Sequence, residues 1–531
     1  MRGSASLSFS RTAAYRGAIG RKDGHRVFNR GVHTGGATAE GTRLFADRFP
    51  AVAKVKVPKT GWTLSGAGFG GYRVNTSVPA HAYALSSAFS SGINVVDTSG
   101  HFENGDSERL IGAVLDEKIR KGELTRESVV LMTKAGYLVD PSNPRYDFEH
   151  AVVADRIAHS IAPEYLEREI SASLARLGVE KIDVFMLNNP ERLLLDKRFE
   201  LPRVYESIAR AAEHLDKEVK RGRISGYGLC SNSVHNRSAQ DHISLPQILA
   251  SMEQARANHA NFLAIEYPFN IFEHDAYDRW FDGSESLMEV AASNRLFQFT
   301  QRPIMAIANG SIRILSTNLG VSVDDESNII TCLSEAFTGV IELETQIPEL
   351  LGGSPDDMAL VAKFVWGRVL SDNLTRLSEN MFAARHYLQR QVAPALQRDL
   401  ATLVQSAEQA PNKDELLTWA DQYQERYNKL QAAFLDLSAV SLVRVNQDLA
   451  TIVAATMQPN DSISASDPLA TTAIRVARSA LAACGGDDGG GGVGCVLVGA
   501  RSKEYVADVV QAASAPLFDA DAVDRVLQAA F

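Results

Sequence analysis

The chain has 531 residues, of which 45% are hydrophobic and 22% charged, and its formal net charge is −10 at pH 7. This is an ordinary globular composition, and no uncharged apolar run approaches the roughly 18 residues that a membrane span needs, which excludes an integral membrane protein. The four cysteines cannot form a disulfide scaffold, and none is spaced as a metal-binding pair. Such cysteine usage fits a reducing compartment.

The charge is unevenly distributed along the chain. Residues 1–36 contain seven arginines and lysines against one acid and so carry +6, which leaves −16 for the remainder. A basic, serine-containing, acid-poor leader without an apolar centre is typical of an organelle transit peptide, although a disordered basic tail is the alternative. We expect residues 1–40 to direct the protein to the mitochondrial matrix. The acidic remainder argues against nucleic-acid binding, which needs a concentrated basic surface.

Strand-like and helix-like segments alternate along the chain. Amphipathic helices are expected between the apolar segments, and a helix over 470–483 precedes the last of them. Repeated βα units with short connections indicate a parallel sheet covered by helices, and eight strands close a (β/α)8 barrel. The eight predicted strands are 62–71, 93–97, 129–134, 182–187, 224–230, 262–267, 303–308 and 495–499.

The interval 309–494 is far longer than one βα connection. Residues 354–408 and 412–458 are poor in glycine and rich in helix formers, which predicts long helices. We therefore expect a TIM barrel with a large all-helical insertion between strand seven and the last barrel helix. The predicted domains are a leader (1–40), the first part of the barrel (41–319), the insertion (320–460) and the barrel completion (461–531). The glycine tract 485–492 is predicted to be a flexible loop.

The glycine cluster at 66–71 has two interpretations. Gly66, Gly68 and Gly71 follow a strand in a G-x-G-x-x-G pattern, and Asp97 ends the next strand, as in a Rossmann dinucleotide site. That site needs a helix to begin at the third glycine. Here a polar segment containing Pro79 follows instead, so the pattern favours a strand that bends at a barrel mouth.

From Gly66 onward, the order of motifs resembles the aldo-keto reductase superfamily over about 60–315 and 465–515. The leader and the insertion have no counterpart in this resemblance. It is carried by the segments 92–99 (GINVVDTS), 105–112 (GDSERLIG), 132–134 (MTK), 173–178 (SLARLG), 182–191 (IDVFMLNNPE), 228–232 (GLCSN) and 497–502 (LVGARS).

The resemblance implies a barrel that binds NADPH across the carboxyl ends of the strands and passes hydride to a carbonyl substrate. It also implies a catalytic set of Asp, Tyr, Lys and His, in which a lysine paired with the aspartate lowers the pKa of the tyrosine that donates the proton. The aspartate matches Asp97 and the lysine Lys134. The tyrosine position holds Phe102 and the histidine position Asn188. Because phenylalanine cannot donate a proton, we expect slow or atypical catalysis.

Two neighbouring residues are alternative proton donors. His101 precedes Phe102 and has an ordinary pKa near 6.5, and Tyr137 lies three residues past Lys134. A bound water is the third option. Asp97 and Lys134 themselves could equally form a structural buried pair.

The resemblance places cofactor contacts at the ends of later strands. Ser231 and Asn232, beside Cys230, match a Ser-Asn pair that holds the nicotinamide carboxamide. Glu266 stands where the family has glutamine, and Asn270 lies nearby. Arg501 and Ser502 match contacts to a 2′-phosphate, which arginine can bind in bidentate fashion, whereas Val509 replaces the family's adenine-contacting asparagine.

Two functional hypotheses follow. The first is an aldo-keto reductase-like oxidoreductase that uses NADPH on a small-molecule carbonyl substrate and is weak or atypical. The second is a non-catalytic barrel that acts as a cofactor-binding or assembly subunit. In that case residues 320–460 would dock a protein partner, because amphipathic helices outside a complete barrel need a surface to cover their apolar stripes.

Overall fold

The computed structural model describes residues 31–139, 146–279, 283–308, 311–352, 354–408, 410–457, 467–484 and 494–530. Most of the basic leader and the whole glycine tract 485–492 therefore lie outside the described residues. Within the described ranges, no helix is both long and apolar enough to cross a bilayer.

Eight parallel strands close a barrel in the order β3-β4-β5-β9-β10-β11-β12-β15, which confirms the predicted fold. Successive strands are parallel around the whole ring, from β3 paired with β4 to β15 paired with β3. The strands are β3 (Ala67–Gly70), β4 (Val95–Asp97), β5 (Val130–Ala135), β9 (Ile182–Asn188), β10 (Ile224–Cys230), β11 (Phe262–Pro268), β12 (Phe297–Gln301) and β15 (Gly494–Val498).

Helices cover the outside of the barrel. Several begin with proline in their first turn, where its missing N–H costs nothing, and Gly178 ends α4 in the left-handed conformation at φ 70°. The covering helices are α2 (Pro79–Ser90), α3 (Asp106–Arg120), α4 (Pro163–Leu177), α5 (Leu201–Lys220), α6 (Leu245–Gln254), α7 (Leu287–Ser293), α15 (Pro468–Ala483), α16 (Lys503–Ser514) and α17 (Ala520–Ala529).

The amino-terminal end of the barrel is closed by a hairpin of β1 (Lys54–Lys56) and β2 (Thr63–Ser65), next to α1 (Ala39–Asp47). Trp62 and Val57 belong to the same apolar cluster as the side chains inside the barrel. The predicted strand 62–71 is thus two strands, because β2 pairs below the barrel and only β3 enters the ring. The segment 72–78 after Gly71 is not helical, which removes the Rossmann interpretation.

The predicted seventh strand at 303–308 is wrong. The barrel strand is β12, and residues Met305–Ala308 instead form β13, which pairs antiparallel with β14 (Ser311–Ile314) outside the ring. Strand β12 was not predicted from the sequence because the residues that point outward from it are polar. Gln298, for example, is fully buried, accepts a hydrogen bond from the Tyr267 hydroxyl at 2.5 Å and donates to the Met288 carbonyl at 3.1 Å.

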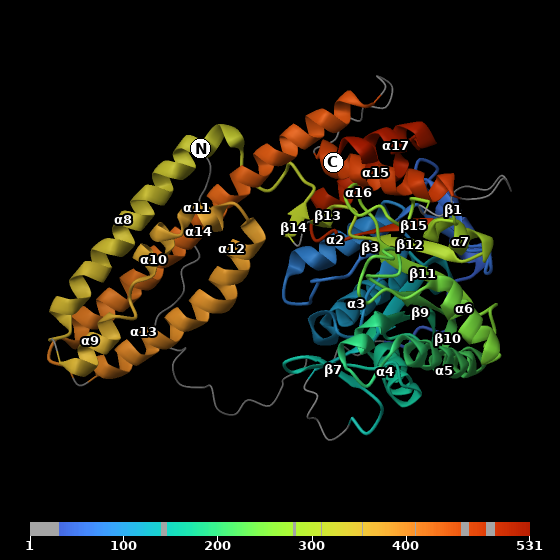
Figure 1. Ribbon diagram of the computed structural model, residues 1–531, viewed down its shortest axis with the longest axis horizontal. Coiled ribbons are helices and arrows are strands. Elements are labelled where there is room, and N and C mark those ends of the chain that lie inside the picture. The colour runs from blue at the N-terminus through green and yellow to red at the C-terminus, as the bar shows by residue number, and fades with distance from the viewer. Residues whose placement is uncertain are drawn as a thin grey trace.

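The insertion forms an elongated helical unit beside the barrel (Figure 1). Its two longest helices, α8 and α14, pack against each other, and the end of α14 returns to the barrel at α15 and α17. Helix α14 covers most of the predicted helical segment 412–458, whereas 354–408 is divided into shorter helices. The helices are α8 (Glu326–Leu350), α9 (Pro355–Val361), α10 (Trp366–Asp372), α11 (Leu374–Ser378), α12 (Met381–Tyr387), α13 (Ala393–Ala407) and α14 (Lys413–Ala455).

The helical unit has a core of its own, separate from that of the barrel. At its centre, the rings of Trp419 and Tyr423 stack at 4.9 Å, and Phe364 meets Trp419 edge-on at 5.0 Å. The indole of Trp419 donates to the Leu343 carbonyl at 2.9 Å. The apolar stripes of the inserted helices therefore cover one another.

We predict that Trp419→Ala destabilises the helical unit by about 3–5 kcal/mol, because it leaves a cavity and an unpaired carbonyl, and leaves the barrel stable. Calorimetry should show the transition of the helical unit shifted down while that of the barrel stays in place. Ile330→Ala, on an exposed face of α8, is the matched control and should shift neither. An equal shift of both transitions would mean that the two cores unfold together.

Candidate functional site

The carboxyl ends of the barrel strands carry a layer of polar side chains that face inward. In β4, β5, β9, β11 and β12, residues two or four positions earlier belong to the apolar cluster inside the barrel, and side chains on a strand alternate with period two. Strand ends at this face are where barrels of this kind hold their sites. The layer consists of Asp97, Lys134, Asn188, Cys230, Glu266 and Gln301.

Lys134 is held between two carboxylates. Its Nζ lies 2.5 Å from Asp97 Oδ1, 2.9 Å from Glu266 Oε1 and 2.7 Å from Glu266 Oε2. All three side chains are buried, with exposed fractions of 8% or less. The sequence-based expectation of an Asp97–Lys134 contact is therefore met in the structure, and Glu266 joins it from the far side of the ring.

The cluster has one ammonium for two carboxyl groups, so its protonation is coupled. Burial raises the pKa of Asp97 to about 7, against the pull of the Lys134 ammonium and with the Glu266 carboxylate adding to the rise. Burial alone would lower the pKa of Lys134, but the two carboxyl groups raise it above its ordinary value. Burial, with Glu266 nearby, also keeps the pKa of the Cys230 thiol well above its usual range. Lys134 is a permanent cation, and Asp97 is the group that takes up a proton.

The two altered positions of the catalytic set lie at this cluster. Phe102 opens a short 3-10 turn, η1 (Phe102–Gly105), and its ring centroid is 5.9 Å from Lys134 Nζ. Tyr72 packs edge-on against the ring at 5.2 Å. Asn188 ends β9 and is 4% exposed. The Lys134 ammonium thus faces the ring of Phe102, which has no hydroxyl group that the ammonium could activate.

His101 is adjacent to this site but is neutral. The Ser99 hydroxyl donates to the Lys134 carbonyl at 2.7 Å, so the Nδ1–H of His101 must donate to Ser99 Oγ, also at 2.7 Å. Burial lowers the pKa of His101 to about 4, with Lys134 and His159 contributing. At neutral pH its one ring proton is used by Ser99, which makes it a poor acid.

The predicted Ser-Asn pair lies on the loop after β10. Ser231 is buried, and its oxygen accepts from the N–H groups of Ser233 at 3.2 Å and Val234 at 3.1 Å. It is therefore used to shape this loop. Asn232 is more accessible: its Oδ1 accepts from Gln301 Nε2 at 3.2 Å, which leaves one amide N–H₂ and one amide carbonyl available between the two residues.

Two residues at this edge were not expected from the sequence. Gln301 was missed because strand seven was placed six residues too late. Glu191 is fully buried, its Oε1 accepts from the Asn232 N–H at 2.9 Å, and Oε2 has no partner. Burial raises the pKa of Glu191 to about 7, although hydrogen bonds oppose the rise. Glu191 ends the segment 182–191, which carries part of the family resemblance, and this position was the one indication of a role that the sequence offered.

The structure separates the remaining predicted cofactor residues. Glu266 is bound to Lys134, and Asn270 holds a turn, its Oδ1 accepting from Phe272 N–H at 3.0 Å and Glu273 N–H at 2.9 Å. After β15, Ser502 caps α16 by accepting from the Tyr505 N–H at 3.4 Å. Arg501 precedes this cap and is exposed.

Comparisons with known proteins find similarity over part of the chain. The aldo/keto reductase family matches residues 66–282. The chain is 31% identical over 192 residues to a D-threo-aldose 1-dehydrogenase from Pseudomonas sp, which covers 34% of this chain and 52% of that protein. It is 29% identical over 138 residues to an NADH-specific methylglyoxal reductase from Escherichia coli (strain K12), covering 26% and 36%. The chain thus spans about half or less of these curated relatives.

Among solved structures, the chain is similar to the holo form of an aldo-keto reductase from Bacillus halodurans. The sequence identity is 14%, the TM-score is 0.44, and the match covers 90% of this chain and 97% of that one.

The cluster makes stability depend on pH. The pKa of Asp97 is higher in the folded state, at about 7, than in an unfolded chain, at about 3.9, so the folded protein binds the extra proton between these values. We predict that this group makes the free energy of unfolding fall as pH rises from about 4 to about 7, by at most about 1.4 kcal/mol per pH unit.

Urea unfolding across this range should show that Asp97→Asn removes that part of the slope. Glu266→Gln should move the slope to lower pH, because the Glu266 carboxylate helps to raise the pKa of Asp97. Asp47→Asn, at an exposed position, is the control. An unchanged slope in Asp97→Asn would show that Asp97 is ionised throughout.

Proposed function

Because the chain is a divergent member of the aldo-keto reductase superfamily, we propose that it is an oxidoreductase acting on a small carbonyl compound with a nicotinamide cofactor. The observation that carries the proposal is the inward polar layer at the carboxyl ends of the strands, with Lys134 paired to Asp97 at its centre. A cavity of about 220 Å³ adjoins His101, Lys134 and Tyr137.

The available amide groups suit a nicotinamide carboxamide. That group has one carbonyl acceptor and one N–H₂ donor, and Asn232 with Gln301 leaves the complementary pair free, as described above. A reduced nicotinamide supplies hydride when bound. The chain's own residues orient it: Gln301 and Asn232 hold each other at the ends of β12 and β10, and Glu191 fixes the Asn232 backbone.

A phosphate group is best accommodated after β15. Arg501 and Lys503 are both exposed at the start of α16, where the helix dipole also favours an anion. The adjacent Ser502 cap keeps the α16 N-terminus in place. These charges favour NADPH over NADH, in contrast to the relative whose name specifies NADH.

The altered catalytic set lacks its usual proton donor. Removing a general acid typically costs about 10²–10⁴-fold in rate, and Phe102 supplies no proton. The alternative interpretation, a barrel that docks a partner through residues 320–460, finds no support in the helical unit, since its apolar stripes are covered by its own core.

We predict that the purified protein binds NADPH and that the bound NADPH quenches the tryptophan fluorescence of the protein during a titration. Arg501→Ala should weaken NADPH binding about 10- to 100-fold, which corresponds to one charge-assisted hydrogen bond of about 1.5–3 kcal/mol, and leave NADH binding within about twofold. Arg43→Ala, on α1 at the opposite end of the barrel, is the control. A protein that binds neither cofactor at millimolar concentration would refute the proposed function.

A further inference from the structure

Tyr137 is held at the barrel mouth by a bend that requires glycine. It opens β6 (Tyr137–Val139), which begins two residues after β5 ends. At Gly136 between them, a Cβ atom would lie 2.3 Å from the Asn188 carbonyl oxygen and 2.6 Å from His159 Nε2. The bend is therefore packed tightly against the end of β9, and it places Tyr137 next to that strand.

The hydroxyl of Tyr137 accepts a hydrogen bond from the loop after β9 and has a cation nearby. The side-chain amide of Asn189 donates to it at 2.9 Å, and the Arg192 guanidinium lies beside it, close enough to raise the pKa of that arginine despite burial. Asn189 Oδ1 is also 4.0 Å from Cys230 Sγ, which belongs to the inward layer. The side chain of Asn189 thus connects the phenol oxygen to Cys230 of the inward layer.

The hydroxyl proton of Tyr137 is not used in a hydrogen bond within the described residues. Within the described part of the chain, no acceptor is hydrogen-bonded to the Tyr137 O–H, whereas the Asn189 amide donates to its oxygen. The ring is fixed by two histidines, His101 at 4.9 Å between centroids and His159 edge-on at 5.3 Å. His159 is in turn held by donating from Nε2 to the Asn188 carbonyl at 2.7 Å.

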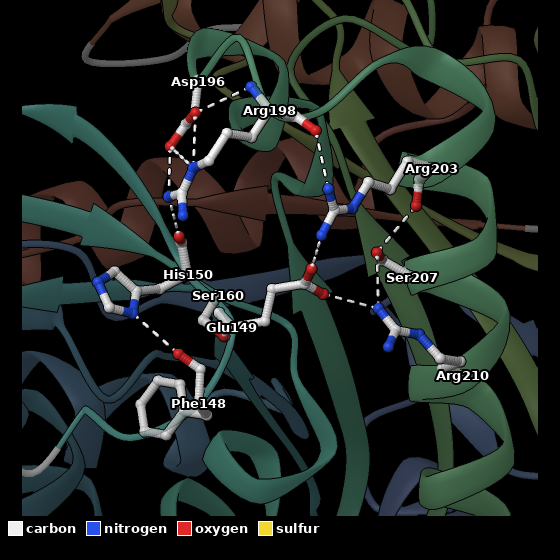
Figure 2. A network of polar contacts seen from close by, with 9 residues as sticks. All are labelled: Phe148, Glu149, His150, Ser160, Asp196, Arg198, Arg203, Ser207 and Arg210. Carbon is white, nitrogen blue, oxygen red and sulfur yellow. Dashed lines mark hydrogen bonds and ion pairs between the residues drawn. The ribbon is translucent and has the colours of Figure 1, made fainter.

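The sheet that carries Tyr137 is fastened to the barrel. Strands β6, β8 (Ile157–His159) and β7 (Ala151–Ala154) form it, with Tyr137 opposite His159. Figure 2 shows the fastening: Glu149, just before β7, lies between Arg203 and Arg210 of α5. Arg198, itself paired with Asp196, donates to the His150 carbonyl at 2.8 Å. These contacts lie directly before the start of β7 and hold the position of the sheet.

We propose that Tyr137 is the proton donor of this enzyme and that Arg192 and Asn189 replace the lysine that activates the phenol in its relatives. The inference rests on the proposed function. The Tyr137 O–H bond breaks as its proton passes to the carbonyl oxygen, while the carbonyl carbon gains hydride from the reduced nicotinamide cofactor. The carbonyl becomes an alcohol, the cofactor is oxidised, and the phenolate regains a proton from water.

The arrangement explains why Lys134 can be neutralised by two carboxyl groups. A guanidinium beside the phenol favours the phenolate that forms as the proton leaves. Asn189 adds a donor to the same oxygen. Lys134 is then free to act as the buried centre of the inward layer.

The test compares Tyr137→Phe with Tyr427→Phe in the full-length protein. Tyr427 is the matched control, because its buried hydroxyl has no hydrogen-bond partner within the described residues and it lies in the core of the helical unit. Each variant is titrated with NADPH, and its reduction of 4-nitrobenzaldehyde is followed under single-turnover conditions. Arg192→Gln is measured in the same way.

We expect Tyr137→Phe to slow hydride transfer by about 10²–10⁴-fold with the dissociation constant for NADPH within about twofold of the parent. Arg192→Gln should lower the maximal rate with little change in KM, and Tyr427→Phe should change neither. Retained turnover in Tyr137→Phe overturns this role alone. Failure of the unaltered protein to bind NADPH overturns the proposed function, and this role with it.

Discussion

The site depends on one ammonium group that two buried carboxyl groups share. Lys134 keeps its charge between Asp97 and Glu266, and without it neither acid could stay ionised in the barrel, because an unpaired buried charge costs several kcal/mol. The second carboxyl group changes the chemistry of the pair. The cation is fully neutralised within the layer, so it has little attraction left to offer a phenol, and the source of the proton must lie elsewhere at the mouth.

In this account the alternative proton source comes from the chain segment that follows β5. The extra sheet β6-β8-β7 extends the chain beyond β5 and places Tyr137 against the end of β9, where the Asn189 amide donates to its oxygen. The helical unit has no part in this geometry. Since it has its own core, the barrel closes between β12 and β15 as it would with a short connection.

Much of the fold could be predicted from the sequence, because the local pattern of apolar residues marks most strands and helices. Apolar runs such as 182–187 and 224–230 match their strands almost residue for residue, and Asp97 and Lys134 end up in contact. Glu266 could not be paired with Lys134 in this way, since 132 residues separate them and their strands are not neighbours. Strand seven failed for a related reason: Gln298 and Thr300 are buried under helices, and nothing local marks a polar residue that the tertiary structure will cover.

The state of Lys134 can be measured by introducing a phenol beside it. Phe102→Tyr adds one tyrosine near the ammonium, and alkaline difference absorbance against the parent reports the pKa of that one group. If Asp97 and Glu266 neutralise Lys134, the added phenol should titrate at or above its ordinary value near 10. A pKa well below 10 would mean that the ammonium still acts on its neighbours, and would contradict this account of the site.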